Sequence, residues 1–154
     1  MPKELKEGDK APDISLMTDT GEKFQLSGVK GKNVVLYFYP KADTPGCTKE
    51  ACEFRDTSKK FTKANTVIVG VSPDTEGDQA KFKSKFGLPF TLLADKDHAA
   101  AEEYGVWKEK NMYGRKYMGV ERTTFIIDGH GVIKRIFPKV KVEGHAEEVL
   151  AAVD

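Results

Sequence analysis

The chain has 154 residues, and its net charge of +1 comes from 25 basic and 24 acidic side chains. A hydrophobic fraction of 39% and a mean hydropathy of −0.49 are typical of a globular domain that buries a core without metal or disulfide crosslinks. The charge balance argues against nucleic acid or an anionic membrane as the main partner. The longest apolar run, residues 34–39, is far too short to cross a bilayer. We therefore expect one domain spanning residues 1–154.

The chain has two cysteines, Cys47 and Cys52, and its opening segment Met1–Glu7 has no apolar stretch of the secretory type. Two cysteines in a chain of this length do not make the disulfide framework of a small secreted protein. We therefore expect a cytoplasmic protein whose thiols are reduced. A zinc site needs four ligands, and the three histidines lie far from both cysteines in the sequence. We expect no metal and no cofactor.

Apolar periodicity and turn residues divide the chain into alternating strands and helices. We predict strands at 14–17, 22–26, 33–39, 66–71, 90–93, 123–127 and 132–137, and helices at 48–64, 72–86, 98–104 and 143–152. The run 33–39 is apolar on both faces, which is typical of a central strand covered by helices on both sides. This order predicts an α/β protein with a thioredoxin-like fold, in which a mixed central sheet is flanked by helices and extended by an N-terminal β-hairpin.

Cys47 lies at the predicted start of a helix, directly after the central strand. Thr44 is a good N-cap residue and Pro45 suits the first helical position, which places Cys47 at the third. We expect the Thr44 hydroxyl to accept a hydrogen bond from the N–H of Cys47. Because helix N-termini favour negative charge, this position favours a thiolate, the nucleophilic form of cysteine. The end of such a strand is also where open α/β sheets bind their ligands.

Cys52 follows five residues later on the same predicted helix. Five helical residues turn the side chain by about 500° and separate the two Cα atoms by about 8.6 Å, which exceeds disulfide reach. The two thiols can therefore bond only if the first helical turns unwind. Inert core thiols are equally consistent with this spacing. A Cys-x-x-Cys motif is absent, which argues against a thioredoxin-type reductase.

The segment as a whole resembles a known family. Pro40, Thr44 and Cys47 reproduce the P-x-x-x-T-x-x-C signature of peroxiredoxins, and Cys52 resembles the resolving cysteine of the bacterioferritin comigratory protein (PrxQ) subfamily. The likeness runs almost end to end, and it includes GDKAPD at 8–13, VSPD at 71–74, FTLLAD at 90–95, GVW at 105–107, MYG at 112–114 and RTTFIID at 122–128.

The resemblance implies a thiol peroxidase that reduces hydrogen peroxide and organic hydroperoxides. Cys47 would attack the peroxide and become a sulfenic acid, and Cys52 would condense with it to an intramolecular disulfide. Thioredoxin or a similar dithiol would then reduce that disulfide. Thr44 would hydrogen-bond the peroxide, Arg122 would hold the thiolate and polarise the peroxide, and Pro40 would shield the sulfur from water. An internal resolving cysteine also implies a monomer.

Several residues have plainer interpretations when the family is set aside. Arg122 is then expected to be a solvated charge at the start of a strand. For Glu50, within a turn of Cys47, the resemblance allows a hydrogen-bonding role near the site, but we expect a solvated carboxylate on a helix face. Residues 134–142 alternate basic and apolar side chains, which is typical of a strand rather than of a nucleic-acid site. Residues 106–120 have little periodicity and predict a loop without regular structure, which either covers the active site, meets the reductant or packs on the surface.

The residues alone leave two other classes of function open. A general thiol–disulfide oxidoreductase would act on protein disulfides and would not consume peroxide. A redox-sensing or holdase-like binding domain would use the cysteine pair to regulate a surface, and would be oxidised without turnover.

Overall fold

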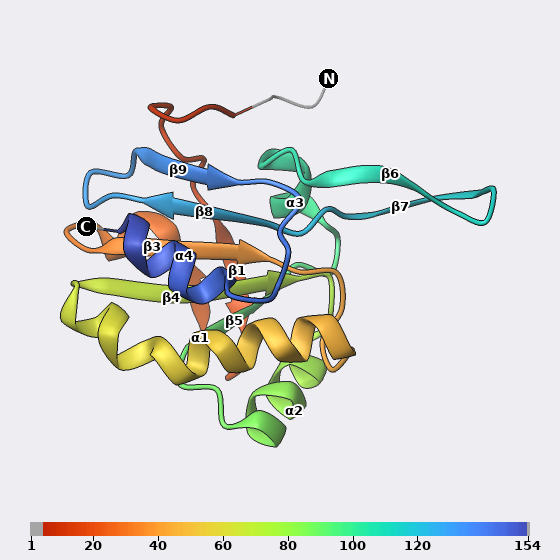
Figure 1. Ribbon diagram of the computed structural model, residues 1–154, viewed down its shortest axis with the longest axis horizontal. Coiled ribbons are helices and arrows are strands. Elements are labelled where there is room, and N and C mark those ends of the chain that lie inside the picture. Colours follow the sequence, from red (N-terminus) through yellow and green to blue (C-terminus); the bar gives the residue numbers. More distant parts are fainter. Residues whose placement is uncertain (1–4, 154) are drawn as a thin grey trace.

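The computed structural model describes residues 5–153, which fold around a seven-stranded mixed sheet (Figure 1). The strand order is β2-β1-β5-β4-β3-β8-β9, in which β3, β4 and β5 are parallel and every other pair is antiparallel. The strands are β1 (Ser15–Thr18), β2 (Lys23–Gln25), β3 (Asn33–Phe38), β4 (Thr66–Ser72), β5 (Thr91–Ala94), β6 (Trp107–Met112), β7 (Arg115–Val120), β8 (Thr123–Ile127) and β9 (Ile133–Phe137). The helices are the short η1 (Leu26–Val29), α1 (Pro45–Lys63), α2 (Glu76–Phe86), α3 (Ala99–Glu103) and α4 (His145–Ala152).

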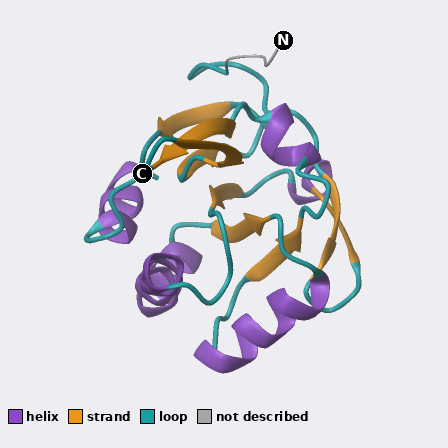
Figure 2. Cartoon of the chain, turned by 90° about the vertical axis from the view of Figure 1, so that its right-hand side faces the viewer, coloured by secondary structure: helices purple, strands orange, loops and turns teal. Residues whose placement is uncertain are grey.

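The central strand β3 separates two apolar cores. Its side chains alternate, so that Leu36 and Phe38 enter one core while Tyr37 and Tyr39, just beyond the strand, enter the other. Helix α3 contributes to the first core, and α1, α2 and α4 contribute to the second. Figure 2 shows the sheet between these two layers of helices. The prediction of a central strand covered on both faces is confirmed.

Most predicted elements agree with the observed ones to within a few residues, but the predicted start of α2 is wrong. The helix begins at Glu76. Thr75 is its N-cap residue, and the Thr75 hydroxyl accepts a 3.1 Å hydrogen bond from the Asp78 N–H. Ser72, the predicted helix start, is instead the last residue of β4 and pairs with Ala94 of β5. The sheet ladder therefore extends one residue beyond the apolar run that predicted it.

The prediction of an irregular loop over residues 106–120 is also wrong. β6 and β7 form an antiparallel hairpin, here named the arm (residues 107–120), with Tyr113 and Gly114 as its turn. Both turn residues have positive φ, 53° and 79°, a combination typical of the type I′ turn that matches the twist of a hairpin. Because much of the arm is exposed on both faces, its sequence lacks the apolar alternation that marks a half-buried strand. The arm projects beyond the sheet (Figure 1).

The prediction for the opening segment falls partly outside the described residues, because residues 1–4 are not among them. Within residues 5–153, none of the helices has the length and apolar character that crossing a membrane requires.

Candidate active site

Cys47 lies in the first turn of α1, as predicted. Thr44 is the N-cap residue, Pro45 opens the helix, and the Thr44 carbonyl accepts the first intrahelical bond, of 2.8 Å, from the Thr48 N–H. The thiol is almost completely buried at the end of the helix where backbone N–H groups lack intrahelical partners. The positive end of the helix dipole therefore acts on a sulfur that is shielded from water.

The expected hydrogen bond between Thr44 and the N–H of Cys47 is not formed. The Thr44 hydroxyl instead donates a 2.8 Å bond to the Lys41 carbonyl, and it makes no cap bond with α1. Asp43, between the two, has a φ of 58°, so the chain turns sharply there. The Thr44 hydroxyl proton is thus used in a hydrogen bond within the loop before α1. The hydroxyl oxygen can still accept a hydrogen bond.

Arg122 lies beside Cys47, although 75 residues separate them in the sequence. Strand β8 pairs antiparallel with β3, so that Thr123 is opposite Phe38 and the preceding Arg122 reaches the start of α1. Its Nη2 donates to Cys47 Sγ at 3.2 Å. A Cβ on Gly46 would lie 3.3 Å from that Nη2, so a glycine at this position leaves room for the guanidinium.

Glu50 completes a chain of three charged or ionisable groups. Its Oε1 accepts a 2.6 Å hydrogen bond from Nη1 of Arg122, and its side chain is only 1% exposed. The interpretation of Glu50 as a solvated carboxylate is therefore wrong, and Arg122, with 17% of its side chain exposed, is not a solvated edge charge either. One guanidinium thus contacts the sulfur through one nitrogen and a buried carboxylate through another.

The electrostatics of this triad follow from burial and charge. Desolvation alone would lower the pKa of Arg122, but the neighbouring Glu50 and Cys47 hold it above its usual value. Burial raises the pKa of Glu50 to about 7, while the ion pair with Arg122 opposes that rise. Arg122 therefore stays charged beside the sulfur, where a cation stabilises an anionic thiolate.

The raised pKa of Glu50 predicts a specific pH dependence of stability. The ordinary pKa of the carboxyl, 4.5, applies to the unfolded chain, whereas the folded value is about 7. The protonated Glu50 carboxyl therefore stabilises the folded state fully below pH 4.5. This contribution to the free energy of unfolding is lost as the pH rises through about 7. Urea denaturation of wild type and Glu50→Gln across this window should show wild type losing free energy of unfolding relative to the variant. The titration of His145 cancels in this difference, and a difference that does not change with pH would contradict the prediction.

Cys52 is half-buried and its thiol is free, as is that of Cys47. Both cysteines lie within α1, which is continuous from Pro45 to Lys63. Of the residues around them, Ala51 and Phe54 are buried in the core beneath the helix. The structure thus brings Cys47 to Arg122, while Cys52 remains on the same helix without being brought to Cys47.

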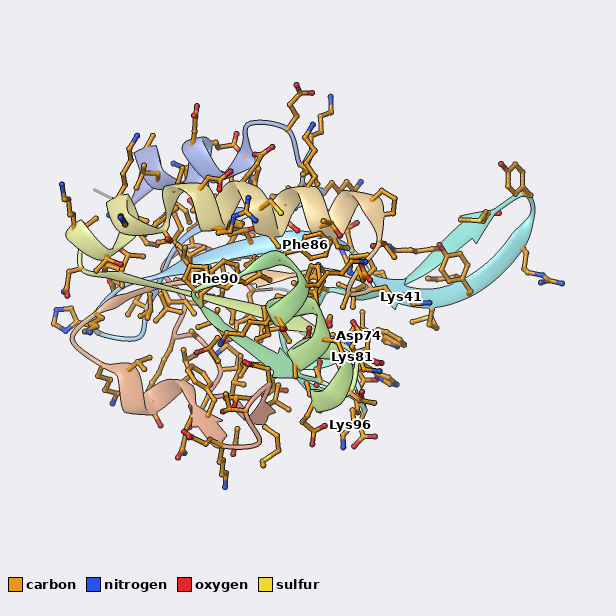
Figure 3. All side chains as sticks on the ribbon, turned by 90° about the horizontal axis from the view of Figure 1, so that it is seen from below. Lys41, Asp74, Lys81, Phe86, Phe90 and Lys96 are labelled. Atoms are coloured by element: carbon orange, nitrogen blue, oxygen red, sulfur yellow. The ribbon has the colours of Figure 1, made fainter. Side chains whose placement is uncertain are left out.

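Residues to which the sequence assigned no role at the site hold the loop before α1. Tyr39, next to Pro40, donates a 2.5 Å bond to Oε1 of the buried Gln79 on α2. Asp74 Oδ2 accepts from the Ala42 N–H at 2.7 Å, and Figure 3 labels Asp74 and Lys41 in this part of the molecule. These bonds fix the half-buried Pro40 and the loop that follows it. Gln79 precedes Phe82 and Phe86 at helical spacing, which was the available signal, but its burial depends on the fold.

This geometry can be compared with known proteins. A family model described as "AhpC/TSA family" matches residues 7–136. The chain belongs to the AhpC/TSA family. Peroxiredoxin Bcp of Bacillus subtilis is 52% identical over 143 residues, which cover 93% of this chain and 91% of that protein.

Solved structures of peroxiredoxins are similar to this chain as well. A PrxQ mutant of Xylella fastidiosa has a TM-score of 0.92 and 36% identity, and the match covers 97% of this chain and 95% of that one. The bacterioferritin comigratory protein of Xanthomonas campestris, studied for alkyl peroxide reduction, has a TM-score of 0.90 and 39% identity, over 96% of this chain and 97% of that one. The thioredoxin-like fold is confirmed, and this peroxiredoxin is a thiol peroxidase.

Proposed function

We propose that Cys47 is the peroxidatic sulfur and that Arg122 activates it. The supporting observation is the 3.2 Å hydrogen bond from Nη2 of Arg122 to a buried Sγ at the start of α1. The Cys47 thiolate attacks the terminal oxygen of a hydroperoxide, and the O–O bond breaks. The sulfur becomes a sulfenic acid, and the departing oxygen takes a proton and leaves as water or an alcohol. Arg122 stabilises the negative charge that develops between sulfur and oxygen.

Thr44 and Pro40 complete the peroxide site in this proposal. Since the Thr44 hydroxyl donates its proton to Lys41, its oxygen is available to accept the peroxide O–H. Such a bond would hold the terminal, proton-bearing oxygen beside the sulfur that attacks it. Pro40 lies half-buried in the loop before α1 and keeps bulk water from the thiolate. The alkyl peroxide reduction named for the relative from Xanthomonas campestris supports organic hydroperoxides as substrates beside hydrogen peroxide.

Cys52 is proposed as the resolving cysteine. Its thiol condenses with the Cys47 sulfenic acid, a disulfide forms, and one water leaves. Because both residues lie in the continuous helix α1, its first turns must unwind before the sulfurs meet. Thioredoxin or a similar dithiol then exchanges with the disulfide, so that its two thiols become a disulfide and both cysteines are restored. An intramolecular disulfide requires no partner chain, which supports a monomer, and reduced thiols suit the cytoplasm.

The test is to add one equivalent of hydrogen peroxide to reduced wild type and to Cys52→Ser, and then to measure intact masses. Wild type should lose two hydrogens as an internal disulfide forms. The variant should gain one oxygen, and dimedone followed by peptide mapping should locate it at Cys47. Unmodified thiols would contradict the proposal, and modification at Cys52 in wild type without a disulfide would contradict its assigned role.

Turnover assays separate the two other functions. A general oxidoreductase would reduce insulin disulfides without consuming peroxide, and a redox sensor would be oxidised once without turnover. We expect neither result: peroxide should be consumed continuously when dithiothreitol or thioredoxin supplies electrons.

A further inference from the structure

The arm exposes apolar side chains that a peripheral hairpin has no structural need to carry. Of the five large hydrophobic side chains that are exposed among the described residues, four lie in the arm. Tyr113 is fully exposed, and Met112, Met118 and Tyr117 are 56%, 50% and 42% exposed. β6 and β7 form a separate two-stranded sheet, and Figure 3 shows it extending well beyond the body of the protein. Such a concentration of exposed apolar groups marks an interaction surface.

The register of the hairpin gives its two faces different charges. Residues opposite each other in an antiparallel pair project on the same side. One side, the cationic face, therefore consists of Lys108, Lys110, Met112, Arg115, Tyr117 and Gly119. The other side consists of Trp107, Glu109, Asn111, Lys116, Met118 and Val120. The cationic face has three basic side chains and no acidic one, whereas the other side has one of each.

The cationic face adjoins the active site. β7 ends at Val120, two residues before Arg122, and Lys108 forms a 3.0 Å ion pair with the intervening Glu121. Burial lowers the pKa of Lys110, and the nearby Arg122 lowers it further, while Glu121 and, to a smaller extent, Cys47 act in the opposite direction. Lys110 is thus close enough to Arg122 and Cys47 to sense their charges. In Figures 1 and 3 the arm leaves the body at the end where α1 begins.

We propose that the cationic face is the docking surface for the protein dithiol that reduces this peroxiredoxin. The reductant would have an acidic surface with apolar residues beside its dithiol. This inference rests on the proposed function, in which that dithiol must reach the sulfurs of Cys47 and Cys52. Tyr117 and Met112 supply apolar contact area, and Arg115 and Lys110 attract the acidic surface. A hydroperoxide or a small dithiol has no such surface, so we expect neither to depend on the arm.

The charge of the cationic face favours a protein over a membrane. Segments that bind anionic membranes carry about four to eight basic residues, whereas the cationic face has three, one of which is paired with Glu121. The net charge of the whole chain is only +1. The electrostatic attraction is therefore local, and it suits a partner that brings its own acidic patch close to Cys47.

Adjacent residues on opposite faces of the arm provide matched variants. Arg115→Glu and Tyr117→Ser alter the cationic face, and Lys116→Glu and Met118→Ser make equivalent changes on the other side. The probe is Escherichia coli thioredoxin with its reductase, and peroxide turnover is followed by NADPH oxidation. We expect Arg115→Glu and Tyr117→Ser each to lower kcat/KM for thioredoxin by about tenfold, with little change in the controls. Added salt should slow wild type more than Arg115→Glu.

Other measurements separate this proposal from the proposed function. Turnover driven by dithiothreitol, and the rate of the first oxidation by peroxide, should be unchanged in all four variants. If wild type fails to consume peroxide with dithiothreitol, the proposed function fails. If it does consume peroxide, the docking proposal is overturned by equal losses in the variants and their controls, or by an unchanged kcat/KM for thioredoxin. It is also overturned if Arg115→Glu abolishes binding to phosphatidylglycerol vesicles, or dissociates a dimer seen by light scattering, without affecting thioredoxin.

Discussion

Replacing Arg122 by methionine should slow the oxidation of Cys47 by hydrogen peroxide by about 100-fold to 1000-fold, the usual effect of removing one donor that stabilises transition-state charge. The substitution removes the 3.2 Å contact with Sγ and the positive charge beside it, while retaining much of the side-chain volume. Competition with catalase for limiting peroxide measures the rate of the first oxidation. That readout does not depend on Cys52 or on a reductant.

Arg122→Met also leaves Glu50 buried without its ion-pair partner, which is costly in itself. The matched control is Arg122→Met with Glu50→Gln, in which the buried carboxylate is removed together with its ion-pair partner. We expect the double variant to recover stability in urea denaturation and to remain as slow with peroxide as the single variant. If the double variant regains the wild-type rate, the slow oxidation came from the orphaned carboxylate, and Arg122 has no direct role at the sulfur.

Phe54→Ala should have the largest effect on stability, a loss of about 3–5 kcal/mol in the free energy of unfolding. Phe54 is fully buried, and its ring centroid lies 4.8 Å from that of Tyr37 and 5.9 Å from those of Phe61 and His145. It is the aromatic anchor between α1, the sheet and α4. Truncation leaves a cavity beneath the helix that carries both cysteines. Urea denaturation of the reduced protein, followed by circular dichroism, measures the loss.

Phe54→Leu is the conservative control, because it fills most of the same space and should cost much less. Similar losses in the two variants would show that the cavity beneath α1 collapses on truncation, contrary to the prediction. Because Phe54 also holds the first half of α1 against the sheet, Phe54→Ala should lower the cost of unwinding near Cys47. Disulfide formation after stoichiometric oxidation should then be faster than in wild type.

The local sequence was sufficient to predict the position of Cys47 at the start of α1. Thr44 and Pro45 mark the start of α1, and the apolar run before them marks a central strand, so the position of Cys47 follows from neighbouring residues. Arg122 was different, because its contact with the sulfur depends on the pairing of β8 with β3. Residue patterns alone indicated a solvated charge, and only the resemblance to peroxiredoxins selected it.

The predictions that were wrong for Glu50, Thr44 and the arm share one physical origin. Glu50 is on a charged helix, and its burial depends on the approach of Arg122 from another part of the chain. Thr44 has the right residue type for a cap, but its hydroxyl bonds to Lys41 because the preceding loop turns back on itself. The arm is a strand pair without a buried face, so apolar periodicity, the main signal for strands, is absent along most of its length.

The ladder between β3 and β8 has a consequence for how heat inactivates this enzyme. Cys47 follows β3 and Arg122 precedes β8. The two residues meet because these inner strands pair side by side, through five residue pairs from Val34–Ile127 to Phe38–Thr123. Separating these strands exposes both cores at once, so it belongs to global melting rather than to fraying at an edge. Reactivity of the sulfur toward peroxide should consequently persist almost to the melting temperature and then vanish together with the fold.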